Sequence, residues 1–359
     1  MEMKEIERLV RMALEPTWRR ERIDCFLGML SALFLAQSVN LHRLAPRMGL
    51  EVQFESITQR IRRLLAEQAF DWETIGRLIL TIAGVPDTGK VTVAVDRTNW
   101  DLGGRFINFL VISVVVNGIG IPVVWEELGK KGNSKTKERI DLLERFLDIV
   151  PAERIRYFLA DREFIGATWF KALQERHIPY AIRVRANQFV VLPNGEEIKI
   201  STLAKKVKGQ CSRHWPTITM GGMSSSLSIK RLDDGDILAV VSFGLRKSAD
   251  PLEVYRQRWG IELCFACLKK KGFNLEDTGL RDKDRLEKIF ALVSIAAAAA
   301  LRASKTANSK TRKKPRLRRA ILLPARPRYC PAVPLLKTTK AQKPTKNLSQ
   351  ICRVVWLKT

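Results

Sequence analysis

The order of strand-like and helical segments in the middle of the chain constrains the fold more than any other feature. Four runs rich in β-branched and apolar residues are typical of buried strands. These runs are residues 91–95, 106–116, 121–125 and 155–160. Gly and Asn supply a hairpin turn between the second and third runs, and helical periodicity covers residues 135–150 and 168–176. This order predicts an α/β fold that opens with three antiparallel strands, then a helix, a strand and a helix.

The patterns on either side of this segment differ from it. Apolar residues recur at helical spacing through the first 85 residues, short strand runs with Gly and Asn turns fill the region after residue 179, and helices return from residue 252. We therefore expect four parts. They are an N-terminal helical domain (1–85), an α/β core (90–178 and 252–301), a β-strand insertion (179–251) and a basic, disordered tail (302–359).

The charge balance indicates a polyanionic partner. The chain has 63 Lys plus Arg against 37 Asp plus Glu, a formal net charge of +26. Such a field attracts nucleic acid first and anionic membrane second. Residues 302–359 hold 17 of these cations, six prolines and no acid.

Nothing in the sequence predicts export or a membrane span. The N-terminus has no signal-peptide pattern, and the apolar run 289–301 is shorter than the roughly 20 residues that a bilayer requires. The six cysteines do not resemble a secreted disulfide framework, and Cys264 and Cys267 form a lone CxxC without a second pair at zinc spacing. We expect a soluble protein of the cytoplasm.

The N-terminal region leaves two interpretations open. Residues 41–65 fit a small helix-turn-helix with Gly49 in the turn, and the second helix then carries Arg60, Arg62 and Arg63. That arrangement would bind DNA. The alternative is an ordinary helical bundle with a solvated basic face.

Two acids follow buried strand runs directly. Asp96 comes after residues 91–95, and Asp161 comes after residues 155–160. Carboxylates at strand ends are recurrent ligands of Mg²⁺, which prefers oxygen donors, and phosphoryl-transfer sites hold two such ions about 3.5–4 Å apart. Taken singly, each Asp is a common cap or turn residue. Asp101 and Glu163 lie close by in sequence and could support them.

A more specific pattern lies further along the chain. Tyr255, Arg258, Glu262 and Lys269 are separated by three, four and seven residues, so on one continuous helix they share a face. One acid beside two cations and a phenol suits a phosphate-bearing substrate near a metal ion. The structural alternative is a solvated face with an Arg258–Glu262 ion pair, worth a few tenths of a kcal/mol.

This pattern resembles the YREK signature of the insertion-sequence-four family of DDE transposases, and Asp96 and Asp161 match the two preceding motifs of that family. The resemblance covers about residues 90–300. It implies a ribonuclease-H-like catalytic core with an inserted β-strand region, in which Asp96, Asp161 and Glu262 bind two Mg²⁺ (or Mn²⁺) ions. It also implies that Tyr255, Arg258 and Lys269 grip the phosphates of the transposon end.

The resemblance further implies the partners and the reaction. The substrates are double-stranded DNA of the terminal inverted repeats and of the target, and a homodimer is expected in the synaptic complex. Some relatives stack a flipped base on an aromatic ring, a role open here to Trp169, Trp215 or Trp259, although core packing is the favoured interpretation for each. Two alternatives are another ribonuclease-H-like nuclease, whose members do not share the YREK spacing, and a decayed copy that binds DNA without full activity.

The tail departs from the family pattern. Members continue after the YREK helix with a His-Gly-rich stretch and a final core helix, and nothing similar follows residue 301. Residues 315–330 can be written in codons whose next reading frame encodes such a peptide. A frameshifted C-terminus would explain the missing acids, whereas a native basic tail would add non-specific DNA affinity.

Overall fold

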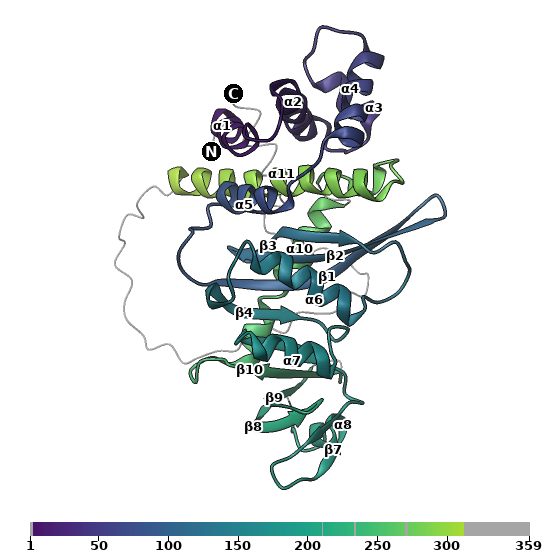
Figure 1. Ribbon diagram of the computed structural model, residues 1–359. Helices are drawn as coiled ribbons and strands as arrows, with labels where there is room; N and C mark the ends of the chain where they lie inside the picture. The colour runs from purple at the N-terminus through teal and green to yellow at the C-terminus, as the bar shows by residue number, and fades with distance from the viewer. Residues whose placement is uncertain (1–2, 210, 233–234, 270–271, 312–359) are drawn as a thin grey trace.

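The structure is a computed structural model that describes residues 3–209, 211–232, 235–269 and 272–311. One mixed sheet of ten strands runs through the molecule, in the order β3-β2-β1-β4-β5-β10-β9-β8-β6-β7. In Figure 1 the N-terminal helices lie above this sheet, and the strands added after β5 extend it downwards. The expected α/β class is therefore confirmed.

The central part of the sheet holds the strands that the sequence predicts first. The strands are β1 (Val91–Leu102), β2 (Arg105–Val116), β3 (Ile119–Glu127), β4 (Ile155–Ala160) and β5 (Tyr180–Val184). β1, β2 and β3 pair antiparallel, whereas β4 pairs parallel with both β1 and β5. An antiparallel β3-β2-β1 hairpin pair followed by parallel β4 and β5 is the arrangement of the ribonuclease-H-like fold.

Helices cover both faces of this central sheet. α6 (Thr136–Leu147) and α7 (Ala167–Glu175) bury Phe146, Trp169 and Phe170 in the cluster on one face. α5 (Trp72–Ala83), α10 (Trp259–Leu268) and α11 (Lys283–Thr311) pack in the cluster on the opposite face. The short helices η2 (Ala152–Arg154) and η3 (Leu275–Asp277) connect these elements.

Two sequence-based boundaries are corrected by the pairing. Asp96 was expected at a strand end, but β1 continues to Leu102 because it stays paired with β2 as far as Leu102↔Arg105. Only the pairing with β4 stops at Val95. The insertion was expected from residue 179, but β5 (Tyr180–Val184) pairs with β4 and belongs to the core.

The inserted strands continue the same sheet rather than forming a separate one. They are β6 (Phe189–Val191), β7 (Glu197–Lys199), β8 (Ser212–Met220), β9 (Met223–Arg231) and β10 (Ile237–Phe243), with α8 (Ile200–Ala204) between β7 and β8. β10 joins them to the core by pairing antiparallel with β5. The apolar side of these strands faces α7 and α8, so the insertion shares one core with the central sheet.

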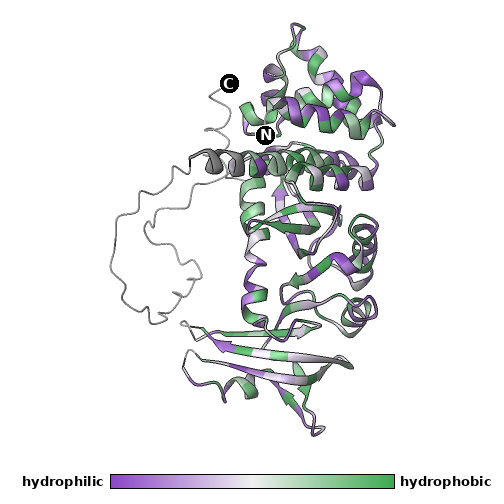
Figure 2. Ribbon diagram, turned by 90° about the vertical axis from the view of Figure 1, so that its left-hand side faces the viewer, coloured by the Kyte–Doolittle hydropathy of each residue, from purple (hydrophilic) through white to green (hydrophobic). Residues whose placement is uncertain are grey.

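The N-terminal region is helical, as predicted. Its helices are α1 (Met3–Leu14), α2 (Arg20–Ala36), α3 (Leu41–Leu44), η1 (Ala45–Arg47), α4 (Phe54–Glu67) and α5. They bury their apolar faces in the same cluster as α11, and α1 to α4 lie on the far side of α11 from the sheet, whereas α5 packs on β3 beside α11 (Figures 1 and 2). Gly49 has a φ of +66° in the turn before α4, a backbone conformation that favours glycine.

The C-terminal helix is longer than predicted. α11 ends at Thr311, ten residues beyond the expected end, and its first half is buried against α5 and β3. The basic tail and the proposed frameshift at residues 315–330 fall almost entirely in residues 312–359, outside the described residues. Within the described part of the chain no single helix is long and apolar enough to cross a bilayer, and only the bent pair of α2 with α3 and η1 passes that test by length and composition.

Candidate active site

Strand register brings two of the predicted acids together. Val95 of β1 is level with Ala160 of β4 in a parallel pair, so the next residue on each strand, Asp96 and Asp161, lies at the same height on neighbouring strands. Adjacent strands are about 4.8 Å apart. Two residues separated by 65 positions in sequence therefore present carboxylates to one point at the carboxyl edge of this strand pair.

The third acid comes from a helical segment that is broken, not continuous as predicted. α9 (Pro251–Arg256) ends just before Arg258, and α10 starts at Trp259. Between them the backbone hydrogen bonds join residues three apart, as in a 3-10 turn. The N–H of Ile261, for example, donates to the carbonyl oxygen of Arg258 at 3.0 Å. Such a tight turn brings side chains three residues apart into line, which places Arg258 beside Tyr255.

Close backbone packing fixes the start of α10. A β-carbon on Gly260 would lie 2.8 Å from the carbonyl oxygen of Gly118, and one on Gly120 would lie 2.9 Å from the α-carbon of Ile261. The β2–β3 turn and the first turn of α10 therefore touch backbone to backbone, and only glycine fits on both sides. This contact holds Glu262 over the sheet.

A single guanidinium connects the acids. Arg258 Nη1 donates to Asp96 Oδ2 at 2.9 Å, Nη2 donates to Glu262 Oε1, and Nε donates to the Tyr255 hydroxyl at 3.1 Å. The Tyr255 hydroxyl in turn donates to Asp161 Oδ1 at 3.2 Å. The structure thus joins Asp96, Asp161, Glu262, Tyr255 and Arg258 in one network.

The network lies in a poorly hydrated environment. Burial raises the pKa of Asp96 to about 7, and the nearby Arg258 and the backbone N–H of Arg97 offset this only in part. Burial likewise raises the pKa of Tyr255, so its phenol stays protonated and available as a donor. Desolvation therefore outweighs the ion pair at Asp96, and a second cation beside it would be favourable.

The donor set fits a divalent ion, although the side chains are not gathered into a finished metal centre. In the described part of the chain no three His, Cys, Asp or Glu side chains are close enough to share an ion. Arg258, a cation, instead spans Asp96 and Glu262. Carboxylate oxygens are the hard ligands that Mg²⁺ or Mn²⁺ takes. Asp96, Asp161 and Glu262 are the residues that would hold it.

The remaining predicted DNA-binding residues lie outside this network. Lys269 follows α10 with non-helical backbone angles and donates to the carbonyl oxygen of Asn99 at 2.6 Å, with Glu276 3.8 Å away. The prediction that Lys269 shares one helix face with Tyr255, Arg258 and Glu262 is therefore wrong. Arg60 and Arg63 are exposed on α4, on the opposite side of α11 from the sheet (Figure 1).

The three tryptophans considered for base stacking differ in exposure. Trp169 is fully buried beneath Phe158, and Trp215 is partly buried with Arg213 over its ring. Trp259 is 47% exposed at the start of α10, three residues from Glu262. Only Trp259 combines an accessible ring with a position beside the carboxylates.

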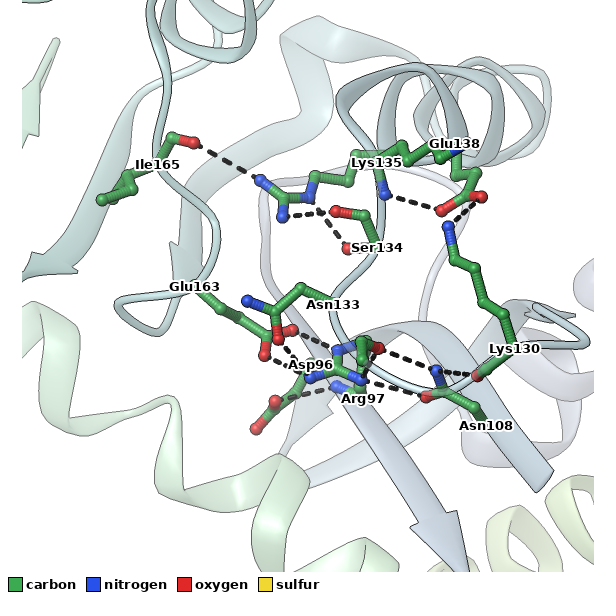
Figure 3. A network of polar contacts seen from close by, with 12 residues as sticks. Asp96, Arg97, Asn108, Lys130, Asn133, Ser134, Lys135, Glu138, Glu163 and Ile165 are labelled. Atoms are coloured by element: carbon green, nitrogen blue, oxygen red, sulfur yellow. Dashed lines mark hydrogen bonds and ion pairs between the residues drawn. The ribbon is translucent and has the colours of Figure 1, made fainter. Parts of the chain in front are cut away.

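A second polar cluster lies beside Asp96 (Figure 3), and sequence reasoning named Glu163 of it as a supporting residue but missed Arg97. Arg97 donates to both carboxylate oxygens of Glu163, at 2.6 and 2.7 Å, and to Asn108 Oδ1 at 3.1 Å. It also donates to the carbonyl oxygen of Gly132 at 2.6 Å and to Asn133 Oδ1 at 2.9 Å. The available signal was a cation directly after Asp96 and an acid two residues after Asp161.

The ribonuclease-H-like sheet and the network that links three acids are the arrangement expected of a DDE-type transposase. The family of the transposase DDE domain matches residues 87–299, more than half of the chain. The chain belongs to this family. Its matched region begins just before β1 and ends within α11, so it contains all five residues of the network.

Similarity to solved structures is remote. A synaptic complex of the piggyBac transposase with hairpin DNA is 14% identical, with a TM-score of 0.45, covering 87% of this chain and 74% of that chain. Endonuclease V from Bacillus subtilis is 12% identical, with a TM-score of 0.25, covering 67% of this chain and 96% of that chain. Likenesses this remote carry no information about the site. Among curated proteins, none matches this chain.

Proposed function

We propose that this chain is a transposase of the YREK-signature type, which cleaves the terminal inverted repeats of a transposon and joins them to target DNA. The observation that carries the proposal is the network in which Arg258 and Tyr255 connect Asp96, Asp161 and Glu262. These residues come from β1, the end of β4 and the α9–α10 segment. The alternative interpretation, a solvated helix face with one Arg–Glu ion pair, does not explain why Arg258 and Tyr255 also bind Asp96 and Asp161.

The proposed reaction is phosphoryl transfer with Asp96, Asp161 and Glu262 as the ligands of two Mg²⁺ or Mn²⁺ ions. When bound, such ions acidify the attacking water or DNA 3′-hydroxyl and stabilise the leaving oxygen. The chain contributes the carboxylates, the low hydration around Asp96 and the phenol of Tyr255, which fixes the Asp161 oxygen by a hydrogen bond.

Arg258 would act as an exchangeable cation. Its guanidinium pairs with both Asp96 and Glu262, and Arg258 as a whole is only 9% exposed. Its bidentate fork equally suits a phosphate. With Asp96 and Glu262 holding metal ions, Arg258 would be available to bind a phosphate of the DNA end, and Lys269 would exchange the Asn99 carbonyl for another phosphate. Arg60 and Arg63 on α4 would bind the end at a distance from the cut, in a synaptic homodimer.

The test is cleavage of the DNA that flanks the gene, with inverted repeats as the substrate. Asp96→Ala, Asp161→Ala and Glu262→Ala should each abolish Mg²⁺-dependent nicking while end binding persists. The losses should not add in double variants, because the three acids act as a unit. Asp141→Ala, an exposed acid on α6, is the matched control and should cleave normally. Retained nicking in Asp161→Ala would remove that residue from the site.

The same assay separates the two alternatives. A nuclease without transposase activity would nick the end but would not join a 3′-hydroxyl to target DNA. A decayed copy would bind the end and show no cleavage even with the unaltered chain and Mn²⁺.

A further inference from the structure

The ends of β3 and β4 lie at the same edge of the central sheet as Asp96 of β1. β3 runs parallel to β1 because both are antiparallel to β2, and β4 is parallel to β1. The loop after β3 and the loop after β4 therefore lie at the same edge as Asp96. Residues 128–135, here called the lysine loop, leave β3 and lead into α6.

The lysine loop is held at this edge by inward hydrogen bonds. Asn108, which is fully buried in β2, donates to the carbonyl oxygens of Lys130 and Gly132 at 3.0 Å each. Arg97 binds Gly132 and Asn133 of the loop, and Arg139 of α6 binds the hydroxyl and carbonyl oxygens of Ser134 at 2.8 and 2.7 Å. With its carbonyl groups bound inward, the loop has a defined position (Figure 3).

Arg97 couples that position to the catalytic acids. Its backbone N–H donates to Asp96 Oδ1 at 2.8 Å, and its guanidinium binds Glu163, which follows Asp161 by two residues. All five N–H donors of the guanidinium are accounted for by contacts with β2, the lysine loop and the loop after β4. Arg97 therefore connects the loop to the segments that carry both acids.

The outward side of the lysine loop is cationic. Lys131 and Lys135 are exposed, and neither has an ion pair in the part of the chain that the structure describes. Lys131 Nζ lies 5.7 Å from the centre of the Phe106 ring, a contact that leaves its charge available. Lys130 and Lys137, in contrast, pair with Glu138 and Asp141.

We propose that the lysine loop binds the phosphate backbone of the DNA that lies across the carboxylates, and that Arg97 is the positioning residue that fixes the loop relative to Asp96 and Asp161. The inference rests on the proposed function. Successive residues on β1 point to opposite faces, so Arg97 and the lysine loop lie on the other side of the strand from Arg258 and α10. The DNA is thus gripped from both sides of the catalytic edge.

The first experiment measures DNA affinity of the full chain by fluorescence anisotropy at several salt concentrations, with labelled double-stranded DNA of the flanking sequence. The double variant Lys131→Ala/Lys135→Ala should bind about tenfold more weakly, and its salt slope should fall by about two, because each phosphate contact contributes about 0.9 to the slope. Its urea midpoint should not change.

The matched control is Lys199→Ala. Like Lys131, Lys199 is exposed and its Nζ lies over an aromatic ring, 5.3 Å from the centre of Phe189, but it belongs to β7 at the far end of the sheet. Its affinity and slope should equal those of the unaltered chain. If the double variant also binds with unaltered affinity and slope, the lysine loop does not contact DNA. Loss of cleavage in Asp96→Ala would still support the proposed function in that case.

The second experiment tests the positioning role. Arg97→Lys keeps the charge but loses the fork to Glu163, so the Mg²⁺ concentration for half-maximal cleavage should rise severalfold and the salt slope of DNA binding should fall. Arg176→Lys, which weakens a more exposed pair between Glu144 of α6 and the residue after α7, is the control for an Arg→Lys change away from the site. An Arg97→Lys protein with the Mg²⁺ dependence and salt slope of the control would overturn the role of Arg97.

Discussion

Replacement of Asp96 by Asn should stabilise the folded protein while it abolishes cleavage. Burial raises the pKa of this carboxyl from 3.8 to about 7, so between these values the folded state keeps a proton that the unfolded state has released. The free energy of unfolding must then fall as the pH rises from about 4 to 7. A shift of about three pKa units corresponds to about 4 kcal/mol.

Asn is a close neutral substitute for the protonated acid, and it cannot ionise. Asp96→Asn should therefore exceed the unaltered chain in unfolding free energy by up to about 4 kcal/mol at pH 8, and the gain should vanish near pH 4. The measurement is urea unfolding in EDTA between pH 4 and pH 8. Equal dependence of the unfolding free energy on urea concentration in the two proteins confirms that their unfolded states are comparable. Asp87→Asn, at an exposed position before β1, is the control.

Mg²⁺ provides a second arm of the same test. It should raise the urea midpoint of the unaltered chain, because an ion that binds only the folded state stabilises it, and it should have little effect on Asp96→Asn. An Asp96→Asn protein that is less stable than the unaltered chain at pH 8 in EDTA would refute the reasoning, since the Arg258 ion pair would then outweigh desolvation.

Three further outcomes follow from the structure. Tyr255→Phe removes the bonds to Asp161 and Arg258 and should cost about 1–3 kcal/mol in urea unfolding, with slower single-turnover cleavage; unchanged values would show that the phenol is dispensable. Gly260→Ala places a methyl group against the β2–β3 turn and should lower the unfolding free energy by about 1–3 kcal/mol, whereas an unaltered midpoint would contradict the close contact. Arg60→Ala/Arg63→Ala should reduce the salt slope of end binding by about two without changing stability, and equal slopes would argue for a merely solvated α4 face.

The sequence by itself determined the order of elements and the chemistry available to them. β-branched runs and helical periodicity predicted the β-β-β-α-β core and the N-terminal helices, because alternation and 3.6-residue spacing reflect which faces are buried. The spacing of Tyr255, Arg258 and Glu262, with Asp96 and Asp161 after strand runs, identified five residues that the structure then brought together.

Tertiary structure decided how those residues meet. Register between β1 and β4, which no local pattern encodes, put Asp96 level with Asp161, and continued pairing with β2 carried β1 past Asp96 to Leu102. The tight turn between α9 and α10 directs Arg258 toward the carboxylates, and the end of α10 at Leu268 leaves Lys269 outside the helix. Residue spacing predicts which side chains share a face of an ideal helix. The contacts that a charged side chain makes depend on burial and on partners distant in sequence. The five contacts of Arg97 are of this kind, since they join residues from 97 to 163 that only folding places around one guanidinium.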